Sequence, residues 1–168
     1  MFWNSVYTLK LRTLDLRKNT KAENAVLFDE ISDAAPASLS PPETMDCEGS
    51  IESVHASRPS PQITTVENAQ SVSGWMGVWA RDGQVPDSVY VLLTGGSGKK
   101  IYVRAHSTRR DDIKLHFHQS GMRDPGYAAL VDVSGLQGKF TLSLARVYKG
   151  NLSVCRQFHL PLLINLQP

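Results

Sequence analysis

The sequence predicts an all-β fold: an antiparallel β-sandwich of about seven or eight strands, immunoglobulin-like or jelly-roll-like, with an N-terminal tail. Short segments rich in β-branched and aromatic residues recur along the chain, and turn signals separate them roughly every eight to twelve residues. The segment Gln70–Ala80 carries large apolar side chains on both faces, because Met76 and Val78 alternate with Trp75 and Trp79. A strand inside a two-layer structure has this pattern.

The first 46 residues differ in composition from the rest of the chain. Met1–Asn19 mixes aromatic, leucine and basic residues, which fits either a segment at a membrane surface or a plain tail. Helical spacing in Thr20–Ile31 predicts a short helix. Proline, serine and alanine dominate Ser32–Asp46, which predicts a linker. The expected division is therefore a tail over residues 1–31, a linker over 32–46 and the sandwich over 47–165.

The first half of the sandwich contains five predicted strands. They are Gly49–Val54 (an edge strand), Gln62–Glu67, Gln70–Ala80, Ser88–Thr94 and Lys99–Ala105. The glycine-rich stretch before Lys99 resembles a phosphate-binding loop at first sight. However, Leu93 stands where that loop needs glycine, and Lys100 stands where it needs serine or threonine. We therefore interpret Gly95–Gly98 as a hairpin turn.

The second half contains one ambiguous segment and three clearer strands. In Arg109–Gln119 the alternation of apolar and polar residues favours a half-buried strand, while a short helix capped by Asp111 or Asp112 is the alternative. The clearer strands are Tyr127–Val133, Lys139–Tyr148 and Leu152–Ile164, the last interrupted at Pro161. Pro59, Pro61 and Pro161 are expected to protect the sheet edges.

We find no pattern of catalytic or cofactor-binding residues. His116 and His118 would share one side of a strand but have no third metal ligand nearby, so we interpret them as solvated. Four carboxylates lie near these histidines and beside turns, where aspartate commonly forms the turn: Asp111, Asp112, Asp124 and Asp132. No nucleophile motif accompanies them. We expect neither an enzyme nor a bound metal or cofactor.

Charge and cysteine content limit the partners and the compartment. The net charge of +2 and the absence of basic runs interleaved with aromatics argue against nucleic acid. Neither a run of about 20 apolar residues nor a signal peptide is evident, which alone would place the chain in the cytoplasm. Cys47 and Cys155 are either two unrelated buried thiols or a disulfide, and a disulfide would require an oxidising compartment.

Several short motifs between Cys47 and Phe158 resemble a known class of domain. They are Cys47-x-Gly-Ser-Ile51, Val72-x-Gly-Trp75, Arg110-x-Asp112-Ile113, Gly126-Tyr127 and Gly138-x-Phe140. The pattern resembles the β-sandwich domains appended to multi-spanning bacterial envelope proteins of the glycosyltransferase or surface-polysaccharide type. This resemblance implies a position outside the cytoplasmic membrane, a Cys47–Cys155 disulfide and a larger parent protein, with Met1–Asn19 as a juxtamembrane remnant. It brings no catalytic residues.

These observations lead to a functional hypothesis. We expect a non-catalytic accessory module in cell-envelope glycan assembly that binds carbohydrate or docks on a membrane-embedded partner; the alternative is a structural or protein-interaction domain. Sugars stack their apolar faces on exposed aromatic rings and bond to polar side chains around them. Trp79, beside Arg81 and Asp82 at a strand end, is the best candidate, although it could also be a core residue. Trp75 and Tyr102 are expected behind it, and Trp75 is expected in the core.

Overall fold

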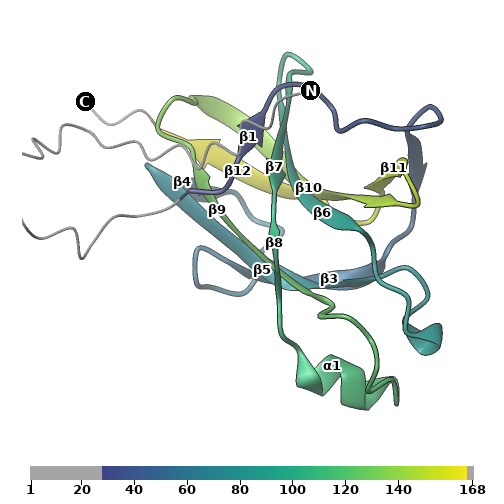
Figure 1. Cartoon of the computed structure of the whole chain (residues 1–168). Coiled ribbons are helices and arrows are strands. Elements are labelled where there is room, and N and C mark those ends of the chain that lie inside the picture. Colours follow the sequence, from purple (N-terminus) through teal and green to yellow (C-terminus); the bar gives the residue numbers. More distant parts are fainter. Residues whose placement is uncertain (1–27, 166–168) are drawn as a thin grey trace, which may run out of the picture.

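The computed structural model describes residues 28–165 as two packed β-sheets with one short α-helix (Figure 1). This arrangement confirms the prediction of a mostly β, sandwich-like fold. The predictions for Met1–Asn19 and for most of the helix in Thr20–Ile31 lie outside the described residues. The described end of that predicted helix is not helical, because Ile31 already belongs to a strand.

The larger sheet has eight strands. Its main order is β1-β7-β6-β10-β11-β2, and β12, itself paired with β4, also pairs with β10. The strands are β1 (Ile31–Ser32), β2 (Glu43–Met45), β4 (Thr64–Val66), β6 (Ser88–Gly95), β7 (Lys100–Arg104), β10 (Gly138–Tyr148), β11 (Asn151–Cys155) and β12 (Leu160–Ile164). The predicted β6–β7 hairpin is confirmed, with the Gly95 N–H bonded to the Lys99 carbonyl at 2.8 Å. The β11–β2 and β12–β4 pairs are parallel, so the expectation of a wholly antiparallel fold was wrong.

The smaller sheet has four strands in the order β3-β5-β9-β8. They are β3 (Glu48–Val54), β5 (Ala69–Gly77), β8 (His106–Thr108) and β9 (Gly126–Asp132). The strand predicted around Trp75 is β5, which pairs with both β3 and β9 over most of its length. β3 is an edge strand, as predicted, and a register shift between Ile51 and Ser53 interrupts its pairing with β5.

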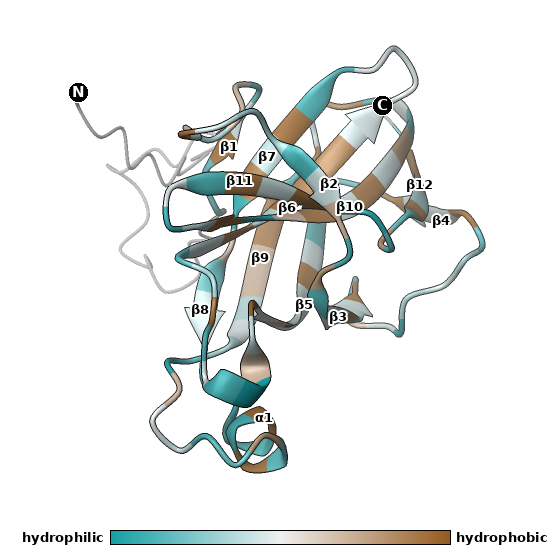
Figure 2. Cartoon of the chain, turned by 90° about the vertical axis from the view of Figure 1, so that its right-hand side faces the viewer, coloured by the Kyte–Doolittle hydropathy of each residue, from teal (hydrophilic) through white to brown (hydrophobic). Residues whose placement is uncertain are grey.

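The main hydrophobic core lies between the two sheets. It includes Val72 and Met76 from β5, Tyr127 from β9, and Leu142 and Leu144 from β10. Hydrophobic and hydrophilic bands alternate along the strands (Figure 2). A second apolar cluster lies on the opposite face of the larger sheet and consists of Leu92, Tyr102, Ala145 and Leu152.

The ambiguous segment forms helix α1 (Asp111–His116), so the strand favoured for Arg109–Gln119 was wrong. Only Ile113 is buried on α1, and Leu115 is 75% exposed, so the alternating residues do not share one buried face. Asp111 and Asp112 occupy the first turn of the helix rather than its cap. Negative charge at that position favours a helix through the dipole of the peptide groups.

The last predicted strand is divided differently from the expectation. β11 ends at Cys155 and β12 begins at Leu160, so the interruption lies before Pro161 and not at it. Pro161 itself pairs with Thr141 of β10. The pairing of β12 with β4 begins only at Leu162, so the ladder on that side does not require a donor from the proline.

The segment predicted as a linker lies against the larger sheet. β2 belongs to the sheet, the Leu39 N–H donates to the Gly150 carbonyl at 2.8 Å, and the Leu152 N–H donates to the Ser38 hydroxyl at 2.9 Å. Ser32–Asp46, predicted as a linker, therefore contains a strand that its composition did not indicate. Strands of two or three residues are too short to show the period-two alternation that predicts strands.

Candidate functional site

Trp79 is 64% exposed in a tight turn that follows β5. The Trp79 carbonyl accepts the N–H of Gln84 at 3.0 Å, and the Trp79 N–H donates back to the Gln84 carbonyl at 3.3 Å. Between these residues the chain forms the 3-10 turn η2 (Ala80–Asp82), and Gly83 closes it with φ of 74°, a left-handed conformation that favours glycine. The short turn therefore holds the indole toward solvent.

A small apolar cluster lies beneath this turn. It is built from Ala80, Val85 and Met122, with Trp75 and Phe117 packed against it. The Trp75 and Phe117 rings are 5.6 Å apart and tilted at 55°. Trp75 is thus half-buried in a satellite cluster beside α1 rather than in the main core between the sheets.

Two hydrogen bonds fix the turn to neighbouring segments. The Gln119 side-chain amide donates to the Arg81 carbonyl at 2.6 Å, and the Ala80 N–H donates to the Glu48 carboxylate at 2.9 Å. The Arg81 and Asp82 side chains are exposed on the same turn as Trp79. Three of the four predicted ligand-binding residues therefore lie together on a supported surface turn.

Tyr102 does not belong to this group. It lies on β7 in the other sheet, is only 5% exposed, and packs in the apolar cluster of Leu92, Ala145 and Leu152. Burial raises the pKa of its phenol. The placement of Tyr102 behind Trp79 was wrong, because alternation along β7 gives the face of the strand but not the packing against that face.

Sequence reasoning missed a cleft that the structure presents. It has a volume of about 380 Å³ and lies between the two sheets, near the point where β7 passes into β8. Its lining comes from five separate parts of the chain, namely residues 29–30, 76, 85–89, 104–107 and 124–127. Trp79, Arg81, Asp82 and Tyr102 do not line it, so the exposed turn and the cleft are separate sites.

The four carboxylates predicted beside turns are engaged in ion pairs around α1 and in a hydrogen-bonded turn at Ser134. The Arg109 guanidinium bonds to Asp111 at 2.9 Å, and Lys114 lies 3.0 Å from Asp124. Asp132 accepts hydrogen bonds from the N–H and hydroxyl of Ser134. These carboxylates anchor the helix and turns in the described structure.

Arg110 ties α1 to the edge strand β3. Its guanidinium contacts the Asp112 carboxylate at 2.6 Å and the Glu52 carboxylate at 2.6 Å. The hydrogen bond from Arg110 lowers the pKa of Asp112 to about 2. The same two partners raise the pKa of Arg110.

His116 and His118 lie at the end of α1, and His118 has a left-handed backbone with φ of 54°. The shared strand face on which a metal pair would depend is therefore missing. Among residues 28–165, no group of three or more histidine, cysteine or acidic side chains is arranged to hold a metal ion.

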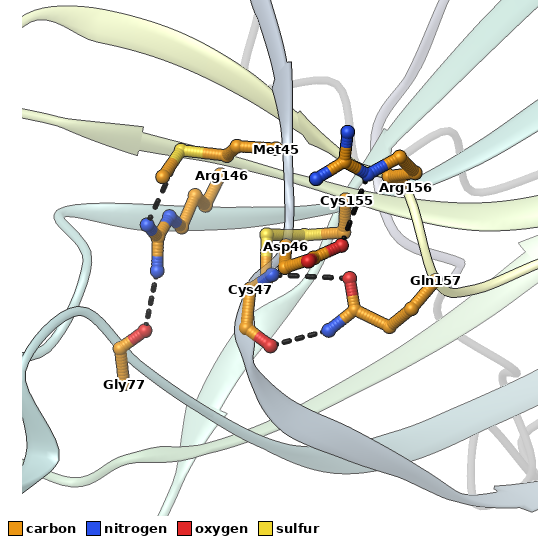
Figure 3. Close-up of a disulfide and its surroundings, with 8 residues drawn as sticks. All are labelled: Met45, Asp46, Cys47, Gly77, Arg146, Cys155, Arg156 and Gln157. Atoms are coloured by element: carbon orange, nitrogen blue, oxygen red, sulfur yellow. Dashed lines mark hydrogen bonds and ion pairs between the residues drawn. A yellow bond between two sulfur atoms is a disulfide. The ribbon is translucent and has the colours of Figure 1, made fainter.

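Cys47 and Cys155 form a disulfide (Figure 3). Their Cα atoms are 5.2 Å apart, and both residues are buried. The Gln157 side chain bonds to both backbone groups of Cys47, accepting its N–H at 3.0 Å and donating to its carbonyl. Because Cys47 leads into β3 and Cys155 ends β11, the bridge joins the two sheets.

Arg146 forms a second link between the sheets, close to the disulfide (Figure 3). It lies on β10, is almost fully buried, and donates a hydrogen bond of 2.6 Å to the Gly77 carbonyl of β5. Burial lowers the pKa of its guanidinium. Burying a cation without a hydrogen-bond partner costs free energy. The bond to the Gly77 carbonyl avoids part of that cost and therefore favours one position of β10 over the end of β5.

Comparison with protein-family models, curated proteins and solved structures finds no match to this chain. In residues 28–165, no helix has the length and apolar character that crossing a membrane requires. The disulfide is consistent with an oxidising, extracytoplasmic compartment.

Proposed function

We propose that this domain is a non-catalytic accessory module of bacterial cell-envelope glycan assembly, and that it binds carbohydrate on the Trp79 turn. The observation that carries the proposal is the 64% exposure of a tryptophan on a turn fixed by backbone bonds and a packed cluster. Leaving a large apolar ring in water costs free energy that a stacked sugar ring would recover.

The neighbours of Trp79 supply the polar part of such a site. The Arg81 guanidinium offers hydrogen-bond donors, and the Asp82 carboxylate offers acceptors, both exposed on the same turn. A pyranose has an apolar C–H face and a rim of hydroxyl groups, so an aromatic ring flanked by charged side chains matches it. Because the turn is already supported, little conformational entropy would be lost on binding.

We also propose a periplasmic location and an immunoglobulin-like or jelly-roll-like class for the sandwich. The buried Cys47–Cys155 bridge supports the location, since stable disulfides are rare in reducing compartments. A cytoplasmic location is the alternative. The two-sheet architecture supports the fold class.

Docking on a membrane-embedded partner or on a parent protein is the second candidate function. It is favoured by Leu115, which is 75% exposed on α1 and gives the surface another large apolar side chain. Assembly through the edge strand β3 is less favoured, because the charged Glu48 and Glu52 and the irregular pairing between Ile51 and Ser53 hinder addition of a further strand.

The test is calorimetric titration of the whole chain with envelope glycans, comparing wild type, Trp79→Ala and Leu115→Ala. We expect Trp79→Ala to weaken binding at least about tenfold, equivalent to about 1.4 kcal/mol, because the stacking surface is lost. Leu115→Ala should bind like wild type.

Stability is the control for this experiment. Both side chains are mostly exposed, so each variant should unfold within about 0.5 kcal/mol of wild type. Absence of binding to every glycan would remove the carbohydrate proposal. Equal binding by wild type and Trp79→Ala would mean that the domain binds glycan at a site other than this turn.

A further inference from the structure

The cleft between the sheets has the form of a small-molecule site. At about 380 Å³ it falls at the small end of the range for ligand pockets, about 300–1,000 Å³. Its accessible apolar lining comes from Val89 and Ala105, which are partly exposed. Met76 and Tyr127 also border the cleft, but they are at most 1% exposed, and the Tyr127 hydroxyl already donates to the Ser50 carbonyl at 3.0 Å.

The polar lining of the cleft is dominated by hydrogen-bond acceptors. Four carboxylates line it, against one guanidinium and one imidazole; they are Asp29, Glu30, Asp87 and Asp124, with Arg104 and His106. An ionised carboxylate only accepts hydrogen bonds and has about four positions for them. The cleft therefore favours a ligand with several hydrogen-bond donors.

Several of these acceptor positions are free within the described structure. Glu30 has no side-chain partner among residues 28–165, and Asp124 pairs with Lys114 through Oδ1 alone. Asp87 is more fully engaged, because one oxygen accepts the Lys149 N–H at 2.8 Å and the other lies 3.9 Å from the Arg123 guanidinium. Lys114 does not line the cleft, so it leaves the cleft side of Asp124 open to a ligand.

Asp29 is the exception, because its carboxylate is committed to the protein. One oxygen accepts the Leu130 N–H at 2.7 Å, the other lies 3.2 Å from His106 Nδ1, and the side chain is 11% exposed. Asp29 therefore builds the wall of the cleft and holds the segment before β1 against β9. Because Asp87 is also partnered, Glu30 and Asp124 are the carboxylates available to a ligand.

We propose that this cleft binds a small organic ammonium ion: a protonated amine carried on a compact, partly apolar body. An ammonium group has three donors and no acceptor, which matches a rim of carboxylates. The apolar body would rest on Val89 and Ala105. Anionic ligands would meet repulsion from Glu30 and Asp124, and neutral ligands would gain hydrogen bonds without the charge attraction.

The test uses three probes of nearly equal shape: cyclohexylammonium, cyclohexanol and cyclohexanecarboxylate. Binding to the whole chain is followed by NMR, through the backbone amides of Ser107, Gly126 and Tyr127. We expect cyclohexylammonium to shift these amides and to bind about tenfold more tightly than cyclohexanol, as two half-exposed charge contacts would give. Cyclohexanecarboxylate should not bind, and added salt should weaken the binding of the amine.

Matched variants test whether the carboxylates at the rim of the cleft cause the preference for the amine. Glu30→Gln combined with Asp124→Asn removes two charges and keeps the side-chain volumes, so it should weaken amine binding several-fold. Asp82→Asn removes one charge outside the cleft and should bind like wild type. Equal affinity for cyclohexylammonium and cyclohexanol, or shifts confined to residues outside the cleft, would overturn the proposal. The Trp79→Ala variant should bind the amine normally, so this site and the carbohydrate site stand or fall separately.

Discussion

The two long edges of the sandwich are closed in different ways, although the chain crosses from one sheet to the other at both (Figure 1). At one edge it passes from β2 to β3 through Asp46 and Cys47. At the other edge it passes from β7 to β8 through Ala105 alone. The first edge is held by the Cys47–Cys155 disulfide, and the second by the polar contact between Asp29 and His106.

This difference explains where the molecule has room for a ligand. The edge with the disulfide also has the buried bond from Arg146 to the Gly77 carbonyl, so the two sheets are held at a fixed distance there. The edge at Ala105 has no covalent bridge, and it is the edge that borders the cleft.

Removing the disulfide should give the largest effect on stability. The bridge spans 108 residues of sequence, and the chain-entropy model assigns about 4–5 kcal/mol to a loop of that length. We expect the double variant Cys47→Ala, Cys155→Ala to lose about 4 kcal/mol of unfolding free energy in urea titrations. Adding a reductant to the double variant is the control, and it should change nothing. A loss below about 1 kcal/mol would mean that the two edges contribute equally.

A methyl group at Gly126 should affect the edge at Ala105, which has no disulfide and which we call the open edge. A Cβ there would lie 2.7 Å from the Thr108 carbonyl oxygen and 2.6 Å from Arg110 Cγ, and it would also meet the Thr108 hydroxyl. We expect Gly126→Ala to cost about 1–3 kcal/mol and to move β8 away from β9.

Gly121→Ala is the matched control, because nothing lies within 4 Å of a Cβ at that position. NMR shifts should map to Thr108 and the cleft lining in Gly126→Ala and stay local in Gly121→Ala. If Gly126→Ala is as stable as wild type, the open edge adapts more easily than its close contacts indicate.

The sequence predicted the parts of the fold that have a clear local period. β5, the β6–β7 hairpin and β10 carry alternating or β-branched residues over at least five positions, so the pattern located them. α1 was only the alternative to a favoured strand, because it has six residues, a length over which periods of 2 and 3.6 fit equally well. β1 and β2 were missed because strands of two and three residues have no measurable period.

The same limit applies to the candidate sites, because only residues that are close together in the sequence form a recognisable pattern. The exposed turn at Trp79 was found because three candidate residues are neighbours in sequence. The burial of Tyr102 had one available signal, the run Val91-Leu92-Leu93 on the neighbouring strand, which places apolar residues on both faces of the sheet. The cleft had none, because its lining joins five distant parts of the chain that only the topology brings together.

Acid should loosen the open edge before the edge that has the Cys47–Cys155 disulfide. This is the smallest effect that we predict. Arg110, which follows β8, holds the pKa of Asp112 at about 2, below its ordinary value near 3.8. A carboxyl whose pKa is lowered by folding stabilises the protein fully above its unfolded pKa. That contribution is lost as the pH falls from about 4 to 2.

We therefore expect amide exchange in α1 and β8 to rise over this pH range. At the other edge the bond from Arg156 also lowers the pKa of Asp46, but the disulfide does not titrate and should keep the amides of β11 protected. Asp112→Asn should reduce the rise in α1 without abolishing it, because Arg109 also lowers the pKa of Asp111, and Asp82→Asn is the control for removing an exposed carboxylate. Equal rises in α1 and β11 would show that the two edges open together, and the distinction between them would then not hold in acid.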